Sequence, residues 1–173
     1  MPEPPPARSV RPATREDVPA LLPMVQAICD WHEALDPRRF DFVPGIAQRY
    51  ARWLPQRIDD PESVVLVAEA GGPGAAGEPP RPAGFVIAQI MDNAPIYRTA
   101  RYGWFHDLWV EPAFRRRGIA RALVDAAVAR LRAAGVTQLR GETARANDAA
   151  RALLARRGFR ESAVEVLLDL SSG

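Results

Sequence analysis

The chain has 173 residues, of which 47% are hydrophobic and 25% charged, the balance of one globular domain with a substantial core. No apolar run approaches the roughly 20 residues of a membrane-spanning helix, and the opening MPEPPPARSV lacks the pattern of a secretory signal, so we expect a cytoplasmic protein with no membrane partner. The net charge is only +2, every basic residue is arginine, and the single cysteine, Cys29, excludes an internal disulfide and a cysteine-based zinc cluster.

The first third of the chain predicts a strand followed by two helices. Residues 1–8 are proline-rich and are expected to be a disordered tail, with a single domain over 9–173. A short strand at 9–12 precedes Thr14, which with Asp17 has the spacing of a helix start. The apolar face of the following helix carries Cys29, where core packing is favoured over a reactive thiol. A second helix is expected at 46–58, after a loop.

Three strands are expected in the middle of the chain. Residues 63–70 and 84–92 are apolar and rich in branched side chains, and the glycines and prolines of 71–83 join them as a hairpin with a long loop. Residues 101–110 form a third strand. Strict alternation would put Trp104, His106, Leu108 and Val110 on one face and Phe105, Asp107 and Trp109 on the other.

The last third predicts a helix from Gly118 to about Ala133, a strand at 136–143, a helix at 147–158 and a final strand at 164–170 that closes the sheet. This order indicates an α/β (α+β mixed) fold. We expect a central mixed, mostly antiparallel sheet of about six to seven strands with about four flanking helices. An exposed sheet edge near the C-terminal strand makes a homodimer possible.

The stretch FRRRGIARAL, residues 114–123, has the form of a phosphate-binding turn. A strand that runs into a glycine-containing turn and then a helix leaves backbone N–H groups unpaired at the positive end of the helix dipole. Gly118 and Ala120 are small enough for close approach of a ligand. A nucleotide-triphosphatase loop needs a lysine and a dinucleotide fingerprint needs three glycines, so both are excluded here.

The pattern Arg115-x-x-Gly118-x-Ala120 after a strand resembles the signature of the GNAT superfamily of acetyl-CoA-dependent N-acyltransferases. NDAARALLARRGF, residues 147–159, is similar to that superfamily's asparagine-helix-glycine-phenylalanine element, and VRPATREDVPAL, residues 10–21, is typical of its first strand and helix. The resemblance covers about residues 9 to 170. It implies a GNAT-like fold and an N-acetyltransferase that passes an acetyl group from acetyl-CoA directly to a primary amine of a small molecule or peptide, without a metal.

The resemblance also implies which residues hold acetyl-CoA. The backbone of Leu108, Trp109 and Val110 would line the pantetheine arm, and the turn from Arg115 through Arg116, Arg117, Gly118 and Ile119 to Ala120 would hold the pyrophosphate. Asn147 would lie near the sulfur end of the cofactor, a role that is compatible with a plain helix N-cap. For Arg116 a solvated side chain is an equal alternative, because a tight turn cannot direct three consecutive arginines at one ligand.

Catalysis by direct attack requires a proton acceptor for the amine and an acid for the leaving thiolate. Many relatives have a tyrosine seven residues after the asparagine, where this chain has Leu154, and a glutamate where it has His106. His106 is therefore a candidate base or else a packing residue. Asp107 is the second candidate, provided that a bulge turns it toward the site. His32 borders the expected acceptor pocket and either contacts substrate or lies on the surface.

Two other functions can be compared with the sequence. Leu154 in place of the tyrosine allows an acyl-CoA-binding sensor with little or no turnover. Nucleic-acid binding through the arginines is disfavoured, because the 23 basic residues lie among 21 acidic ones without an accompanying aromatic stripe. The segment from Trp31 to Trp53 and the loop at 91–102 are expected to choose the acceptor. In the first segment Glu33, Asp36 and Asp41 suit a cationic amine, and Arg38 and Arg39 suit a carboxylate.

Overall fold

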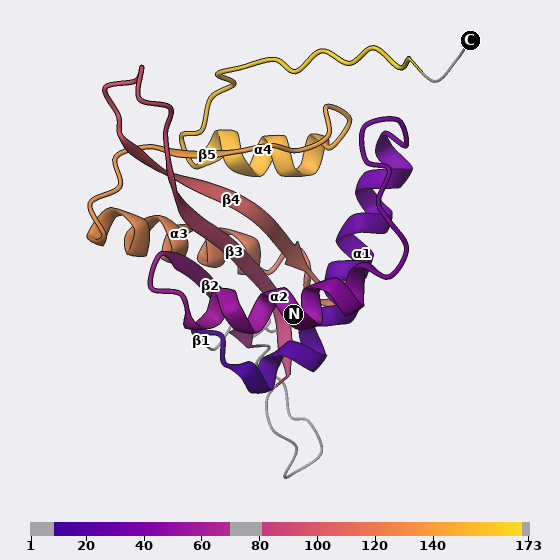
Figure 1. Ribbon diagram of the computed structural model, residues 1–173. Helices are drawn as coiled ribbons and strands as arrows, with labels where there is room; N and C mark the ends of the chain where they lie inside the picture. Colours follow the sequence, from indigo (N-terminus) through magenta and orange to yellow (C-terminus); the bar gives the residue numbers. More distant parts are fainter. Residues whose placement is uncertain (1–8, 70–80, 171–173) are drawn as a thin grey trace, which may run out of the picture.

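The fold is a five-stranded sheet with helices on both faces, seen in a computed structural model that describes residues 9–69 and 81–170 (Figure 1). The strand order is β1-β2-β3-β4-β5, antiparallel throughout except for the parallel β4–β5 pair. The strands are β1 (Ser9–Pro12), β2 (Ser63–Glu69), β3 (Pro82–Asp92), β4 (Arg101–Val110) and β5 (Leu139–Gly141). The helices are α1 (Val18–Leu35), α2 (Ile46–Asp59), α3 (Ile119–Ala133) and α4 (Asp148–Arg156).

The core has two halves, one on each face of the sheet. On one face α1 and α2 pack on β2 and β3 through the fully buried Leu21, Leu54 and Phe85, with Trp109 of β4 at the border. On the other face α3 packs through Leu123 and Ala127 against alternate residues of the same strands. The apolar runs of β2 and β3 therefore have no polar face, because both of their faces are covered.

A partly buried ion pair sets the start of α1. The Asp17 carboxylate accepts two hydrogen bonds from the Arg11 guanidinium at 2.8 Å and a third from the Thr14 backbone N–H at 2.7 Å. The Arg11 guanidinium holds the pKa of Asp17 below its usual value. The predicted Thr14–Asp17 pairing is confirmed, with a single 3-10 turn, Arg15–Asp17, inserted before the helix. These bonds link β1 to the start of α1, on the face of the sheet that α1 and α2 cover.

Most of the predicted elements are confirmed: the hairpin of β2 and β3, the strand over 101–110, the mixed and mostly antiparallel sheet, and four helices within the described residues. The strand expected at 136–143 is shorter, only Leu139–Gly141. Residues 1–8 and 70–80 lie outside the described residues, so the expected tail and most of the hairpin loop stay predictions.

The final strand expected at 164–170 is wrong, and with it the expected six to seven strands, because the described residues hold five. The segment is extended but does not join the sheet. Acidic side chains of this segment form ion pairs with arginines of the loop between α1 and α2, so its contacts are with that loop and not with a strand. An alternating pattern predicts an extended conformation but cannot predict which partner pairs with it.

Candidate active site

A β-bulge in β4 shapes the centre of the site. Ile87 of β3 pairs with Asp107, but the next residue, Ala88, pairs with Phe105, so that His106 has no partner in the register. An extra residue on one strand interrupts the alternation of side chains. The strict alternation expected for β4 is therefore wrong. The two consecutive residues Asp107 and His106 both face α2, where they contact Tyr50 and Trp53 respectively. Phe105 and Leu108 pack on the opposite face, on the α3 side.

Asp107 lies in a largely dehydrated cluster between β4, α1 and α2. Its Oδ2 accepts a hydrogen bond from the Tyr50 hydroxyl at 2.9 Å. Burial raises the pKa of Asp107 to about 6, although the bond from Tyr50 opposes that rise. Burial and the nearby Asp107 charge raise the pKa of the Cys29 thiol to about 12, so this cysteine stays protonated. Asp107 therefore has the properties of a carboxylate that exchanges its proton near neutral pH.

His106 occupies the exposed side of the same cluster. Its ring lies edge-on to Trp53, with 5.6 Å between ring centroids. The pKa of His106 is lowered because neighbouring atoms displace water from the imidazole and because the Arg57 guanidinium repels a second positive charge. Arg57 in turn lies over the Trp53 ring, 5.7 Å from its centroid. At neutral pH His106 is a neutral imidazole that can accept or donate a hydrogen bond.

The strands β4 and β5 separate next to the bulge. Their pairing runs only from Gly103–Leu139 to Phe105–Gly141, so that the end of β4 has no neighbouring strand on that side among the described residues. This free edge comprises Leu108, Trp109 and Val110, the three residues whose backbone was expected to line the pantetheine arm. An extended ligand can pair there as a strand would.

Arg115 closes the end of this free edge. Its Nε donates to the Val110 carbonyl oxygen at 2.9 Å, and its guanidinium lies over the Trp109 ring, 4.6 Å from the centroid. The Trp109 indole N–H is buried and has no hydrogen-bond acceptor within the described part of the chain. The side chain of Arg115 thus positions the strand end in this structure, while Arg116 and Arg117 remain exposed in the turn.

The turn before α3 forms a cradle of backbone N–H groups. Arg116 and the N-cap residue Gly118 both have positive φ, 63° and 79°, which turns the chain sharply into the helix. The first helical bond runs from the Ala122 N–H to the Gly118 oxygen, so the N–H groups of Ile119 and Ala120 have no partner within the helix. A Cβ added to Gly118 would meet no atom within 4 Å, so the space above the turn is open.

The remaining candidates lie on α1 and α4. Asn147 is the N-cap of α4: its side-chain oxygen accepts from the Ala150 N–H at 3.3 Å, and its amide donates to the Thr143 hydroxyl at 3.0 Å. Leu154 is half-buried on α4 and offers no hydroxyl. His32 of α1 bonds the Ile28 carbonyl through Nδ1 at 2.9 Å and contacts Phe40 of the following loop.

The family model of the acetyltransferase (GNAT) family matches residues 25–159, which include the bulge, the free edge of β4 and the cradle. The chain belongs to the GNAT acetyltransferase family. It is accordingly an acyltransferase, and the acetyl donor that this family uses is acetyl-CoA. No curated protein matches the chain.

Solved structures with the same fold cover almost the whole GNAT chain. A tetramutant of the BH1408 protein from Bacillus halodurans is 17% identical, with a TM-score of 0.79 over 94% of this chain and 99% of its own. A predicted acetyltransferase from Clostridium acetobutylicum, solved with acetyl-CoA, is 17% identical, with a TM-score of 0.70 over 94% and 96%. An aminoglycoside 6'-N-acetyltransferase from Acinetobacter haemolyticus is also 17% identical, with a TM-score of 0.67 over 95% and 99%.

Two further properties of this GNAT domain concern the described residues alone. None of their helices is long and apolar enough to cross a membrane. No three of their histidine, cysteine, aspartate and glutamate side chains gather as metal ligands.

Sequence reasoning missed Tyr50 as a site residue. It lies 57 residues from Asp107, and no local pattern links the two. Its spacing of three from Trp53 places both aromatic rings on one face of α2, with 5.1 Å between the ring centroids. The partner of that face is visible only once β4 is placed.

Proposed function

We propose that this GNAT protein is an N-acetyltransferase that acetylates a primary amine of a small molecule or peptide, with Asp107 as the group that accepts the proton of the amine. The observation that carries the proposal is the bulge, which directs His106 and Asp107 to the α2 side of the sheet at the point where β4 and β5 part. A carboxylate with a raised pKa, next to a strand edge that can bind the thioester, is suited to remove a proton from the attacking amine.

The residues present fit acetyl-CoA. The N–H groups of Gly118, Ile119 and Ala120 suit the pyrophosphate, with positive charge from Arg116 and Arg117 close by, and the open space above Gly118 leaves room for it. The free edge from Leu108 to Val110 suits the amide groups of the pantetheine arm. When bound, acetyl-CoA supplies an acetyl thioester, whose carbonyl carbon is the electrophile.

Asp107 is suited to take up a proton because its pKa of about 6 makes it an ionised carboxylate at neutral pH that is still basic enough to bind one. Tyr50 fixes the orientation of the carboxylate through one oxygen and leaves the other free for an amine or a bridging water. We assign His106 a lining role: as a neutral ring beside Trp53 it borders the acceptor without carrying charge.

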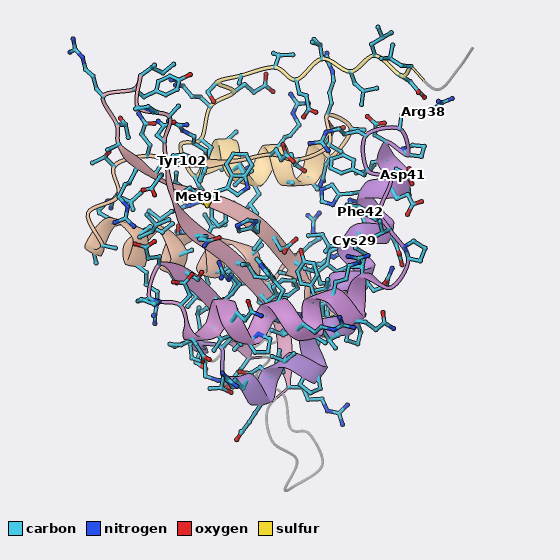
Figure 2. All side chains as sticks on the ribbon, viewed as in Figure 1. Cys29, Arg38, Asp41, Phe42, Met91 and Tyr102 are labelled. Atoms are coloured by element: carbon cyan, nitrogen blue, oxygen red, sulfur yellow. The ribbon has the colours of Figure 1, made fainter. Side chains whose placement is uncertain are left out.

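The charges around the acceptor side favour a cationic amine over a carboxylate. Arg38 forms an ion pair with Asp169, and Arg39 forms ion pairs with Glu142 and Glu165. Both arginines are thus engaged, whereas Glu33 and Asp41 are exposed carboxylates without an ion pair within the described part of the chain. In Figure 2, Asp41 and Phe42 lie on the α1–α2 side, opposite Met91 and Tyr102 of the β3–β4 side. Polyamines and aminoglycosides are therefore the first acceptors to test.

The second candidate function, an acyl-CoA sensor with little turnover, rests on Leu154. A leucine cannot protonate the leaving thiolate, so if the protein is an enzyme, a water molecule or another hydroxyl group has to do so. The enzyme hypothesis and the sensor hypothesis share the acetyl-CoA site and differ in turnover. Thiol release on a broad amine panel separates them: saturable binding without turnover on any acceptor would favour the sensor.

The acetyl-CoA site itself is tested by calorimetric titration of the natural protein, a Gly118→Asp variant and a Gly135→Asp control. Gly118 and Gly135 flank the same helix, both have φ near +80°, and an added Cβ meets no atom within 4 Å at either. The two variants therefore carry matched backbone strain. We expect acetyl-CoA binding to be lost in Gly118→Asp and kept in Gly135→Asp. No binding by the natural protein, or equal binding by both variants, would overturn the site.

A further inference from the structure

Arg140 of β5 is a half-buried arginine that has no acidic partner among the described residues. Four arginines are half-buried in that part of the chain, and the other three, Arg11, Arg39 and Arg57, all form ion pairs with carboxylates. Arg140 instead donates one hydrogen bond, to the side-chain oxygen of Gln138 at 2.8 Å. A guanidinium carries five N–H donors in a planar fork that matches a carboxylate. Most donors of Arg140 therefore have no acceptor within the described ranges.

The guanidinium of Arg140 is held on the face of the sheet that α1 and α2 cover. It lies over the Tyr102 ring, 4.1 Å from the centroid. Arg140 pairs with Trp104 of β4, which in turn pairs with Gln89 of β3. Residues paired across neighbouring strands point to the same face, and Gln89 is two residues from Ile87, which lies in the core with α1 and α2. Arg140 therefore shares a face with the proposed base.

The loop between α1 and α2 reaches the same end of β5. Arg39 of this loop forms an ion pair at 3.0 Å with Glu142, two residues after Arg140. Glu142 is the acidic residue nearest to Arg140 in the sequence, and this ion pair engages it elsewhere. Figure 2 shows Phe42 of the loop across from Tyr102. The loop that is expected to choose the acceptor therefore lies close to the part of β5 that carries Arg140.

Aromatic side chains of β4 lie between Asp107 and Arg140 on this face. Trp104 and Tyr102 are half-buried, and their rings meet edge to face with 6.4 Å between centroids. Such rings offer a flat, largely apolar surface to a ligand. Trp104, the pairing partner of Arg140, is three residues from Asp107, and a strand rises by about 3.3 Å per residue. About 10 Å of strand thus separates the carboxylate that would take the proton from the unpaired guanidinium.

We propose that Arg140 binds a carboxylate of the acceptor, and that the acceptor is a short peptide whose amine reaches Asp107. This inference rests on the proposed acetyl transfer and narrows its acceptor. An extended peptide advances by at most about 3.3–3.6 Å per residue, so three residues span about 10 Å. The acceptor would carry a cationic amine at one end, which Glu33 and Asp41 favour, and an anionic group at the other. A polyamine has no anionic group and would leave Arg140 unpaired.

Two peptides that differ only in charge test the proposal. Triglycine and triglycine amide have the same length, and amidation removes the charge of the carboxylate. Calorimetric titration in the presence of desulfo-CoA measures their binding without turnover, and thiol release with acetyl-CoA measures acetyl transfer. We expect the natural protein to bind triglycine about tenfold more tightly than its amide, as one hydrogen-bonded charge pair in a half-exposed position would give. The same preference should appear in kcat/KM.

An Arg140→Gln variant removes the charge and keeps a hydrogen-bonding side chain. It should bind both peptides equally, at the level at which the natural protein binds the amide. The matched control is Arg132→Gln, at an exposed arginine near the end of α3 on the opposite face of the sheet, and it should keep the tenfold preference. Free glycine, whose carboxylate lies beside its amine, is too short to reach both groups, so its binding should be the same in Arg140→Gln and in the natural protein.

The role of Arg140 and the proposed acetyl transfer fail in different ways. Equal binding of the two peptides by the natural protein, no binding of triglycine, or a full preference in Arg140→Gln would each overturn the role of Arg140. Tighter binding of triglycine than of its amide, without thiol release on any amine, would support Arg140 and overturn acetyl transfer. Thiol release with both peptides at the same kcat/KM would support acetyl transfer and overturn the role of Arg140.

Discussion

The hydrogen bond between Tyr50 and Asp107 is expected to set the pH above which the site catalyses acetyl transfer. Removing the hydroxyl in a Tyr50→Phe variant takes away the one interaction that lowers the pKa of Asp107, and leaves the burial that raises it to about 6. A hydrogen bond to a charged group contributes about 1.5–3 kcal/mol, and each pKa unit corresponds to about 1.36 kcal/mol. We take the lower end of this range and expect the pKa of Asp107 to rise by about one unit.

The assay is kcat/KM for acetyl transfer as a function of pH. If Asp107 must be ionised, the natural protein loses activity below about pH 6, and in Tyr50→Phe the acidic limb moves up by about one unit. The variant should then be about fivefold less active at pH 6 and nearly equal at pH 9. Tyr97→Phe, at a tyrosine that is 56% exposed, is the control and should leave the limb in place. An unmoved or lowered limb in Tyr50→Phe would refute the assignment of Asp107.

Three other variants test neighbouring parts of the site. Asp107→Asn should reduce kcat by about a hundredfold or more yet raise the free energy of unfolding at pH 8 by about 3 kcal/mol. The variant is the more stable because folding raises the pKa of Asp107 from 3.8 to about 6, so ionisation of Asp107 costs stability as the pH rises through that window. Thermal melts at pH 8 and pH 4 check this prediction. The difference in stability between the variant and the natural protein should be smaller at pH 4. His106→Gln should lower kcat by less than about tenfold if His106 only lines the site, and a loss as large as that of Asp107→Asn would transfer the base to His106. Leu154→Tyr should raise kcat by about tenfold if protonation of the thiolate limits turnover, whereas Leu154→Phe, with the same bulk and no hydroxyl, should not.

The helices and the central strands could be predicted because their patterns are local. Periodic apolar residues indicated α1, α2 and α3, and Gly118 and Gly135 bounded α3 by backbone preference alone. Branched apolar runs indicated β2 and β3, whose residues are buried on both faces. The cradle was predictable for the same reason: a strand, a glycine turn and a helix start follow one another directly in the chain.

The bulge in β4 had no comparable signal. Its sequence, RYGWFHDLWV, alternates well enough to suggest a regular strand, and the extra residue is visible only when Ile87 and Ala88 of β3 are paired with Asp107 and Phe105. A bulge depends on the register of two strands that lie far apart in the sequence, so a single strand cannot specify it.

The alternating residues 164–170 likewise indicated an extended segment but not its place outside the sheet. Its ion pairs there are with Arg38 and Arg39, which are more than a hundred residues away in the sequence, so no local pattern indicates them.

The sequence by itself thus determined the order of the elements, the phosphate-type turn at Gly118 and the resemblance to the GNAT superfamily, because each resides in a few consecutive residues. Only the tertiary structure decided that Asp107 turns toward α2, that Tyr50 holds it and that β4 and β5 part beside it. Each of these depends on contacts between elements brought together by packing, and the pKa of Asp107 rises only because that packing removes water from around the carboxylate.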